Sequence, residues 1–369
     1  MRVKLEDVCE RGSSNIKQSD IIKMSGNYPI YGASGLAGKV NFYHQEQPYV
    51  AVVKDGAGIG RTTLNPAKSS VIGTMQYLIP KKNVLPEYLF YVVSYMHLEK
   101  YYTGATIPHI YFKDYKNEEF NLDNIEKQLE IIDVLGRCKK VIEARKQELV
   151  ELDRLTKARF VEMFGDPIQN PKGWDMPLIE EVVANEKNAL KAGPFGSALK
   201  KEYYVASGYK IYGQEQVISD DCTFGDYYID EERYKSLENC AVQPGDVLIS
   251  LVGTYGKLLI MPEVFEPGII NPRLMKITFD KEKVNPYYFK FFFQSESLKK
   301  ALSQNTHGGT MDILNLGIVR KIEMPLPPLK LQNEFVDFVH QVDKSKVAVQ
   351  KALDESQILF DSLMQKYFG

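Results

Sequence analysis

Long apolar runs are missing from this chain of 369 residues, which nowhere has eighteen apolar residues in succession. A membrane-spanning helix needs about 20 of them. The opening residues, Met1-Arg2-Val3-Lys4, lead into polar sequence instead of the apolar segment of a secretory signal. We therefore expect a protein with no membrane span that is located in the cytoplasm.

Cysteine is scarce, and no two of the four cysteines form a Cys-x-x-Cys pair: Cys9, Cys138, Cys222 and Cys240. This scatter argues against a zinc knuckle and against a disulfide framework. The five histidines show neither metal-ligand spacing nor a neighbouring nucleophile: His44, His97, His109, His307 and His340. The sequence therefore predicts no metal site and no catalytic residue.

Nucleotide-binding loops are also absent. Residues 55–61 carry Arg61 at the place of the last glycine of a dinucleotide-binding motif, and residues 253–258 end in Leu258 where a phosphate loop has Ser or Thr. Both stretches are better interpreted as one tight loop between strands, repeated. The run Asn285-Pro286-Tyr287-Tyr288 lacks the second proline of the Asn-Pro-Pro-Tyr clamp of amino-methyltransferases, so a helix start is the favoured interpretation.

What the chain does have is a repeat. Residues 104–165 and 308–369 align at a constant offset without a gap, with Gln128 over Gln332 and the same Phe-Gly pair at both ends. Upstream the likeness is looser and the offset changes slightly. The repeated unit, about 170 to 200 residues, is too long for a solenoid, whose repeats reach about 50. The sequence therefore indicates a duplicated domain with its connector.

The first half of each repeat has an irregular texture. Short β-type runs at residues 49–53, 71–79, 246–251 and 258–261 alternate with clusters of Gly, Pro, Asn and Ser. One helix in each half is predicted to start at a proline, over about residues 86–101 and 286–302. These features predict mixed α+β domains with many loops.

The second half of each repeat is predicted to be one long helix, over residues 125–164 and 331–368, because neither stretch contains proline. Apolar residues recur there at helical spacing, with the predicted packing positions at Leu135, Ile142, Leu149, Leu152, Val339, Val342, Val349, Leu353, Phe360 and Leu363. Polar residues interrupt the seam at Arg145, Thr156, Lys346 and Ser356, which weakens the heptads.

The predicted fold class is α+β: two pseudo-symmetric domains of mixed strands and short helices, joined by two long antiparallel helices that form a coiled-coil spacer. Predicted boundaries are 1–120 and 166–327 for the domains, and 121–165 and 328–369 for the spacer helices. About 39 helical residues at 1.5 Å each span roughly 58 Å. Two domains held at such a spacing suit a polymeric ligand.

Several motifs of the chain resemble those of a known protein family. They are residues 324–329 (MPLPPL) followed by Gln332, the two Phe-Gly helix ends, residues 193–197 (GPFGS) and residues 208–212 (GYKIY). With these the chain resembles the specificity subunit of type I restriction-modification enzymes over nearly its whole length. The first repeat departs from the pattern, because residues 120–125 replace the proline-rich run.

The resemblance implies a non-catalytic subunit that recognises double-stranded DNA. Each domain would be a target recognition domain that reads one half of a bipartite, asymmetric sequence. The helices would set the spacer length and dock two methyltransferase subunits. No cofactor is implied in this chain: S-adenosylmethionine would belong to the methyltransferase subunits, which modify adenine, and ATP and Mg²⁺ to the restriction subunits of the full complex.

The charge of the chain is unusual for a DNA-binding protein, because the formal net charge is −2. Residues 1–120 hold fourteen Lys and Arg against eleven Asp and Glu, so the first domain is mildly basic. If partner subunits supply most phosphate contacts, this chain needs only local positive surface. We therefore expect the isolated chain to bind DNA feebly or non-specifically.

Base reading requires side chains with paired donors and acceptors on loops, and phosphate contact requires cations. In the first domain the candidates are Tyr31, Ser34, Lys39, Lys54, Arg61, Thr106 and His109. In the second they are Lys200, Lys201, Tyr212, Gln214, Gln216, Tyr255, Lys257, Asn271, Arg273, Thr306, His307 and Thr310. Any one of them is as readily an ordinary residue of an exposed turn, and Tyr31 and Tyr212 fit a hydrophobic core equally well.

Two other functions are compatible with parts of the pattern. The long helices would also suit a coiled-coil adaptor or scaffold protein that does not act on DNA. An enzyme hidden in the irregular domains is disfavoured, because no acid, base or nucleophile set converges in the sequence. Purification with a methyltransferase subunit distinguishes the DNA-reading function from the scaffold.

Overall fold

The computed structural model describes residues 1–104, 108–251, 256–304 and 314–369. The chain divides into two compact units. Unit 1 contains Met1–Glu148 and Val349–Gly369, and unit 2 contains Leu149–Ala348. Each unit therefore holds the irregular half of one repeat together with a part of each long helix.

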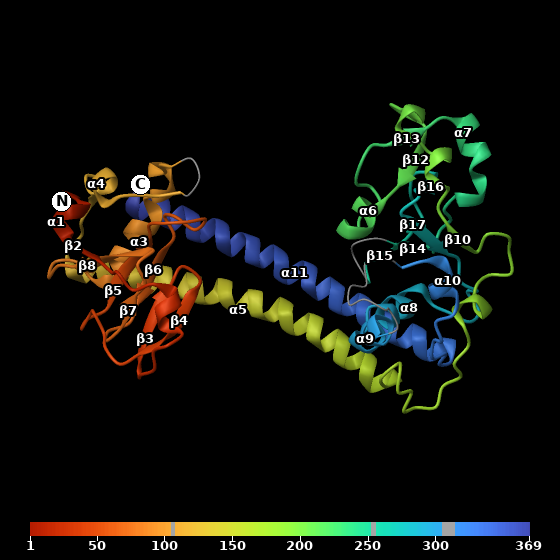
Figure 1. Ribbon diagram of the computed structural model, residues 1–369, viewed down its shortest axis with the longest axis horizontal. Coiled ribbons are helices and arrows are strands. Elements are labelled where there is room, and N and C mark those ends of the chain that lie inside the picture. Colours follow the sequence, from red (N-terminus) through yellow and green to blue (C-terminus); the bar gives the residue numbers. More distant parts are fainter. Residues whose placement is uncertain (105–107, 252–255, 305–313) are drawn as a thin grey trace. The chain divides into compact units, whose positions relative to one another are not determined.

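Unit 1 is built on a four-stranded antiparallel sheet of order β2-β8-β5-β6 (Figure 1). Its strands are β2 (Cys9–Ser13), β8 (Met75–Pro80), β5 (Tyr49–Val53) and β6 (Thr62–Asn65). Every residue of β5 is buried, as expected for an inner strand that is covered on both faces.

A second sheet of unit 1 has the order β4-β3-β7. In it, β3 (Tyr28–Gly32) runs antiparallel to β4 (Gly35–Val40) and parallel to β7 (Ser70–Val71). A third pair joins β1 (Arg2–Lys4) to β9 (Glu119–Asn121) in antiparallel fashion.

The helices of unit 1 are short apart from α3, which contacts the four-stranded sheet and buries Tyr88, Leu89 and Val92. They are α1 (Leu5–Val8), α2 (Gln18–Ile21), α3 (Pro86–Tyr95), the 3₁₀ helix η1 (Leu98–Tyr101) and α4 (Phe112–Tyr115). Pro86 stands at the first helical position, where its missing N–H costs no hydrogen bond.

Unit 2 repeats the two larger sheets. The four-stranded antiparallel sheet has the order β10-β17-β14-β15, with β10 (Leu190–Ala192), β17 (Leu274–Ile277), β14 (Val247–Ser250) and β15 (Leu258–Ile260). The second sheet has the order β11-β13-β12-β16, with β11 (Tyr204–Val205), β13 (Tyr228–Ile229), β12 (Tyr209–Tyr212) and β16 (Gly268–Ile270).

The helices of unit 2 are more numerous among the described residues. They are α6 (Gln214–Ser219), α7 (Glu231–Ser236), α8 (Pro286–Phe293), α9 (Glu296–Gln304) and α10 (Leu316–Arg320). The 3₁₀ helices are η2 (Ile179–Glu181), η3 (Gly196–Ala198), η4 (Lys201–Tyr203) and η5 (Glu238–Cys240).

The two units share one topology. Strands β2, β8, β5 and β6 take the same places in their sheet as β10, β17, β14 and β15. In the second sheets, the parallel pair β3 and β7 corresponds to the parallel pair β12 and β16. The predicted α+β duplication is therefore confirmed for the four-stranded antiparallel sheet and for the parallel pair of the second sheet.

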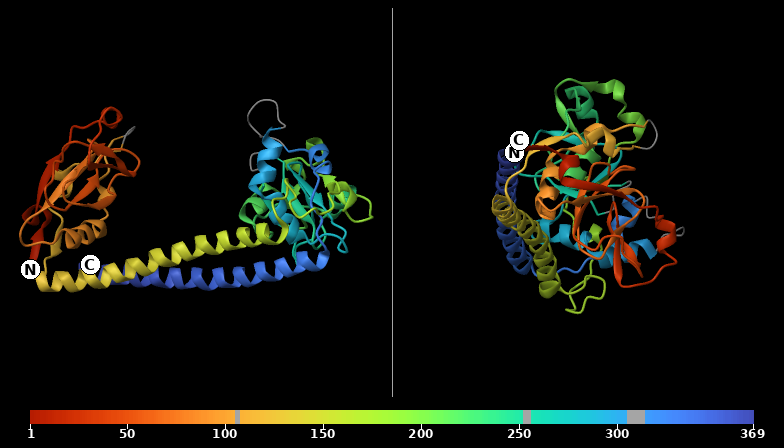
Figure 2. Two further views of the ribbon diagram at one scale, coloured as in Figure 1. Left: turned by 90° about the horizontal axis from the view of Figure 1, so that it is seen from below. Right: turned by 90° about the vertical axis from the view of Figure 1, so that its left-hand side faces the viewer.

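Both long helices have 40 residues, α5 (Ile125–Phe164) and α11 (Leu329–Phe368). The bounds predicted for α5 are confirmed, and α11 starts two residues before its predicted start. In each unit, one part of α5 lies beside one part of α11 (Figures 1 and 2). The ten predicted packing positions are all buried or half-buried.

The two helices run antiparallel. In unit 2, Asp153 pairs with Lys346 at 2.6 Å, and further along α5 the ring of Phe160 meets Phe335 with centroids 5.5 Å apart, so the numbers rise on one helix as they fall on the other. In unit 1, the Cys138 thiol lies 3.9 Å from a backbone carbonyl oxygen of α11.

Gln128 and Gln332, the aligned glutamines, anchor the helix starts in the same way. Through Oε1, each accepts the backbone N–H of the residue before a helix-starting proline, Leu85 in unit 1 and Asn285 in unit 2, both at 2.9 Å. Through Nε2, each donates to two backbone carbonyls of its own unit at 2.9–3.0 Å. Both glutamines are fully buried, and these bonds satisfy their amides.

The Phe-Gly end of each long helix packs in the unit that contains the globular domain of the other repeat. Phe164, at the end of α5, packs edge-on against Tyr288 of unit 2, with ring centroids 4.8 Å apart and an interplanar angle of 72°. Phe368, at the end of α11, meets Tyr88 of unit 1 in the same way, at 5.4 Å and 70°. Each helix therefore ends in the core of the domain that the other repeat supplies.

Two predicted helices are interrupted. The prediction of one helix over residues 86–101 is wrong at its end, because His97 adopts a left-handed conformation with φ 50° that separates α3 from η1. The prediction over residues 286–302 is wrong in its middle, because Ser295 accepts the backbone N–H of Leu298 through Oγ (3.3 Å) and starts α9 as a cap.

The predicted strand over residues 71–79 is also divided. β7 ends at Val71 and β8 begins at Met75, whose N–H donates to the carbonyl of Ile72 (3.0 Å) to close a turn. Gly73 lies in this turn, and its N–H donates to Ile16 at 2.8 Å. The two parts of the predicted strand therefore belong to different sheets.

Candidate nucleic-acid interface

In unit 1, the loop after β5 and the segment around His109 lie against each other. A backbone hydrogen bond of 2.9 Å joins Gly56 to Pro108. His109 Nδ1 and Asp55 Oδ1 are 2.6 Å apart, and the Lys54 ammonium lies 3.8 Å from the same carboxylate. Half-buried polar groups thus hold two loops together at one end of the four-stranded sheet.

Arg61 joins a third loop to this group. Its Nη1 donates to the carbonyl of Ala33 (3.0 Å) in the turn between β3 and β4. Ser34 in that turn is exposed, whereas Tyr31 before it is half-buried and packs against the core. We call the surface formed by Tyr31, Ser34, Lys54, Arg61 and His109 the unit 1 loop face.

In unit 2, a polar network forms at the corresponding end of the sheet. Gln214, the first residue of α6, donates from Nε2 to Ser250 Oγ (2.9 Å), and Arg273 Nη1 donates to Gln214 Oε1 (3.3 Å). Asn271 Oδ1 accepts the Arg273 backbone N–H (2.9 Å), which fixes the turn between β16 and β17. Gln214, Ser250, Lys257, Asn271 and Arg273 are the unit 2 loop face.

The two loop faces are equivalent in the repeat. The last residue of β5, Val53, donates its N–H to the carbonyl of Arg61 (2.9 Å), and the last residue of β14, Ser250, donates to the carbonyl of Lys257 (3.4 Å). Arg61 and Lys257 are both exposed. Each unit therefore presents a cation at the same place. Residues 253–255 of the stretch interpreted as the second copy of this loop lie outside the described residues.

The chemistry of both faces suits DNA. Arg, Lys, Gln and Asn side chains supply the donors and acceptors that read base edges in the major groove, and cations also contact phosphates. Arg273 is exposed and offers a guanidinium with five N–H donors, one of which it gives to Gln214. The structure thus brings together five predicted residues of unit 1 and four of unit 2.

Two predicted residues of unit 2 do not lie on this surface. Tyr212 is fully buried, its hydroxyl donates to the Glu266 carbonyl (2.6 Å), and burial raises the pKa of the phenol. Gln216 is buried as well, with Oε1 accepting the Gly213 N–H and Nε2 donating to the Phe224 carbonyl, both at 2.8 Å. Both side chains stabilise the domain itself, and for Tyr212 the core interpretation is the correct one.

The other predicted residues are placed apart from these networks or outside the description. Lys39 is exposed on β4 opposite Pro29, away from the turn at Ser34. Lys200 and Lys201 are exposed on the loop that follows β10. Five predicted residues lie outside the described residues: Thr106, Tyr255, Thr306, His307 and Thr310. Ser250 is a member of the face that the sequence did not single out, because no local pattern marks it.

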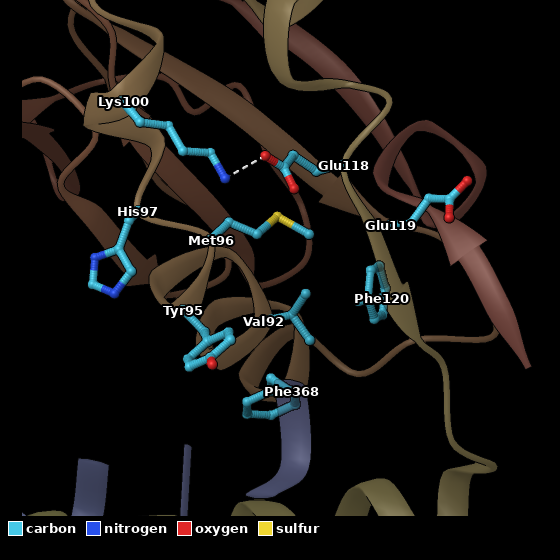
Figure 3. Close-up of a pocket in the computed structure, with 9 residues that line it drawn as sticks. All are labelled: Val92, Tyr95, Met96, His97, Lys100, Glu118, Glu119, Phe120 and Phe368. Carbon is cyan, nitrogen blue, oxygen red and sulfur yellow. Dashed lines mark ion pairs between the residues drawn. The ribbon is translucent and has the colours of Figure 1, made fainter. Parts of the chain in front are cut away.

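A pocket of about 340 Å³ in unit 1 has no loop-face residue in its lining (Figure 3). Its lining is Val92, Tyr95, Met96, His97, Lys100, Glu118, Glu119, Phe120 and Phe368. Both of its carboxylates are in ion pairs, Glu118 with Lys100 at 2.5 Å and Glu119 with Arg2 at 2.7 Å. Paired in this way, they are not poised for acid-base chemistry.

Neither a metal site nor a membrane segment was found among the described residues. In residues 1–104, 108–251, 256–304 and 314–369, no three His, Cys, Asp or Glu side chains gather closely enough to hold a metal ion. No helix in that part of the chain is long and apolar enough to cross a membrane. The Asn285-Pro286 pair starts α8, with Asn285 Oδ1 accepting the Tyr287 N–H (2.9 Å), as the sequence predicted.

Comparison with known families gives one assignment. The family described as the type I restriction modification DNA specificity domain matches residues 1–154 and 171–356. The two matched segments cover both repeats.

Individual relatives agree with this match. The type I restriction enzyme MjaVIII specificity subunit of Methanocaldococcus jannaschii is 22% identical over 359 residues, which covers 89% of this chain and 84% of the relative. The MjaIX specificity subunit of the same organism is 20% identical over 312 residues, covering 78% and 69%.

Solved structures share the fold. The S subunit of a type I restriction-modification system from M. genitalium aligns over 100% of this chain and 96% of its own, with a TM-score of 0.58 and 15% identity. A chain from a structure described as the basis of complex assembly and conformational transition of the type I R-M system aligns over 100% and 97%, with a TM-score of 0.63 and 16% identity.

Proposed function

Because the chain belongs to the family of type I restriction-modification DNA specificity subunits, we propose that each of its domains reads one half of a bipartite DNA target. Residues 1–120 form the first target recognition domain and residues 166–327 the second. The two long helices, 121–165 and 328–369, set the length of the unread spacer. The chain itself recognises DNA and leaves the chemistry to its partners.

The observation that supports this proposal is the duplicated loop face. Each face lies at the corresponding end of the four-stranded sheet of its own unit, but the side chains differ. The unit 1 loop face has Lys54, Arg61 and His109, and the unit 2 loop face has Gln214 and Arg273. Equivalent position supports one task for both domains, and different side chains support different half-sites, which makes the target asymmetric.

Charge supports a dependence on partners. Residues 166–327 hold 18 Lys and Arg against 22 Asp and Glu, so the second domain is acidic although its loop face is basic. Such a domain gains little from the phosphate backbone alone. Two methyltransferase subunits with S-adenosylmethionine would clamp the DNA and modify adenine, and restriction subunits with ATP and Mg²⁺ would join them in the cytoplasm. No cofactor is assigned to this chain.

Two residues support docking of two copies of one partner. Leu155 on α5 and Leu359 on α11 are aligned in the repeat, and their exposed fractions are 48% and 54%. Because the two leucines take the same position on the two helices, a partner that contacts one helix there can contact the other in the same way. Each therefore supports one docking site for a methyltransferase subunit.

An exchange of domains tests the proposed function. The chain, expressed with its methyltransferase subunits, is expected to direct adenine methylation to a bipartite motif found by mapping methylated adenines. Replacing residues 166–327 by the domain of another family member should change one half-site and leave the other and the spacer intact. The reciprocal exchange of residues 1–120 is the control. A scaffold that does not act on DNA would leave the methylation pattern unchanged.

Lengthening both helices together is expected to lengthen only the spacer. Seven residues inserted after Glu148 and seven after Ala348, with helix-forming residues in heptad order, keep the antiparallel seam in phase. They add about 10.5 Å, or about three base pairs at 3.4 Å each. Methylation mapping should show unchanged half-sites about three base pairs further apart. Altered half-sites would contradict the separation of reading from spacing.

A further inference from the structure

Phe195 is the most exposed aromatic residue among those described, with 90% of its surface open to solvent. Gly196 and Ser197 after it are exposed too, but Pro194 before it and Leu199 further along the same loop are buried. An isolated phenyl ring held in water costs free energy that burial would recover. Buried residues thus anchor the loop on both sides of Phe195, while the Phe195 side chain itself remains in solvent.

The backbone around Phe195 is fixed against the unit 2 loop face. Gly193 donates its N–H to the carbonyl of Leu274 (2.9 Å), and a Cβ atom at Gly193 would lie 1.9 Å from the Asn271 carbonyl oxygen. Only glycine allows this close approach. On the other side, the Ala198 N–H donates to the Phe195 carbonyl (2.8 Å). Phe195 therefore lies in a constrained turn that begins at Gly193, whose backbone packs against Asn271 of the unit 2 loop face.

The corresponding segment of unit 1 behaves differently. After β2, the chain places Ile16 against a buried cluster that contains Ile21, Ile30, Val40 and Ile72. Unit 1 thus half-buries the apolar residue of this segment, whereas unit 2 presents Phe195 to solvent. The exposure of Phe195 is therefore not a requirement of the shared fold.

We propose that Phe195 contacts the second half-site by packing against the C5-methyl group of a thymine. Phe is one of the side chains that contact this methyl group in the major groove, where the groups of the loop face read base edges. A ring carried on a constrained turn makes such a contact without the entropy loss of ordering the loop. The inference rests on the proposed function, since a half-site that contains a methylated adenine always contains a paired thymine.

The test uses the chain in complex with its methyltransferase subunits and a duplex that carries the mapped target. Each thymine of the second half-site is replaced in turn by deoxyuridine, which removes only the methyl group. The wild-type complex is expected to lose about fourfold in affinity at one position, the factor for one buried methyl group. Phe195→Ala should lose about tenfold on the unmodified duplex and nothing further on the uracil duplex at that position.

Val264→Ala is the matched control, because Val264 is 89% exposed in the same unit but precedes β16, at the end of that strand opposite Asn271. It should bind both duplexes like the wild type. Wild-type affinity of Phe195→Ala, or an equal loss to uracil in both proteins, overturns the proposal. The proposed function is tested separately. It holds if the wild-type complex methylates a bipartite motif, whatever Phe195→Ala does. It fails if a domain exchange leaves both half-sites unchanged.

Discussion

Replacing Lys276 by methionine is expected to lower the free energy of unfolding of unit 2 by about 3–5 kcal/mol, because it leaves a buried carboxylate without its counter-ion. Asp246 is fully buried, and its Oδ2 lies 3.1 Å from Lys276 Nζ. The Gln243 N–H (2.9 Å) and the Thr278 hydroxyl also donate to this carboxylate. Thermal unfolding of the chain, with hydrogen exchange to identify unit 2, measures the change.

The loss should depend on pH with a known sign. Burial raises the pKa of the Asp246 carboxyl more than Lys276 and its hydrogen bonds lower it, and removal of Lys276 raises it further. A carboxyl whose pKa is higher in the folded than in the unfolded state destabilises the fold above the folded pKa, and the penalty vanishes below the unfolded pKa. The deficit of Lys276→Met should therefore be largest at neutral pH and shrink on acidification.

Removing the stranded charge provides the control. Asp246→Asn in the Lys276→Met background removes the buried charge. Its amide oxygen can accept the Gln243 N–H and its amide N–H can donate to the Thr278 hydroxyl, so the double variant should recover most of the lost stability. Lys235→Met removes an exposed partner of Glu231, 2.7 Å away, and should leave unfolding unchanged. A Lys276→Met variant as stable as the wild type at neutral pH would contradict the role of the ion pair.

The same sheet position in unit 1 shows that the fold does not require an ion pair. Tyr49 on β5 takes the place of Asp246, which directly precedes β14. Tyr77 on β8 takes the place of Lys276 on β17. The rings of Tyr49 and Tyr77 are 5.1 Å apart. Buried ion pairs are often replaceable by apolar contacts at no loss. One architecture is therefore stabilised by an aromatic pair in one repeat and by a charged pair in the other.

The long helices were predictable because their signal is both local and repeated. A proline-free stretch with apolar residues at helical spacing has one regular solution, and the Phe-Gly pairs mark both ends. The shorter helices were not, because single residues interrupt them. His97 adopts a left-handed conformation, which a histidine in the sequence does not predict. The hydroxyl of Ser295 caps α9, but a serine predicts a cap only where the chain already turns.

The candidate site was predictable as a set of loops but not residue by residue. Arg61, Gln214 and Arg273 lie where polar loop residues were expected. Tyr212 and Gln216 do not, because both are buried. Their side chains donate to the carbonyls of Glu266 and Phe224, which are 54 and 8 residues away along the chain. Exposure is a tertiary property, and no sequence spacing encodes it.

Replacing the phenylalanine at the end of each long helix by alanine should destabilise the unit that holds the globular domain of the other repeat. Phe368 belongs to the second repeat but packs in unit 1, so Phe368→Ala should destabilise unit 1. Phe164 belongs to the first repeat but packs in unit 2, so Phe164→Ala should destabilise unit 2. Each change empties a buried aromatic site, at a cost of about 3–5 kcal/mol.

Hydrogen exchange followed by mass spectrometry separates these outcomes, since peptides of α3 report on unit 1 and peptides of α8 on unit 2. In Phe368→Ala, exchange should accelerate in α3, around Tyr88, and remain unchanged in α8. Phe164→Ala should show the reverse, around Tyr288. Phe224→Ala is the control, because Phe224 is half-exposed and its loss should affect neither helix. Acceleration in the helix of the same repeat would mean that each long helix belongs with its own domain, and the crossed arrangement of the helix ends would be wrong.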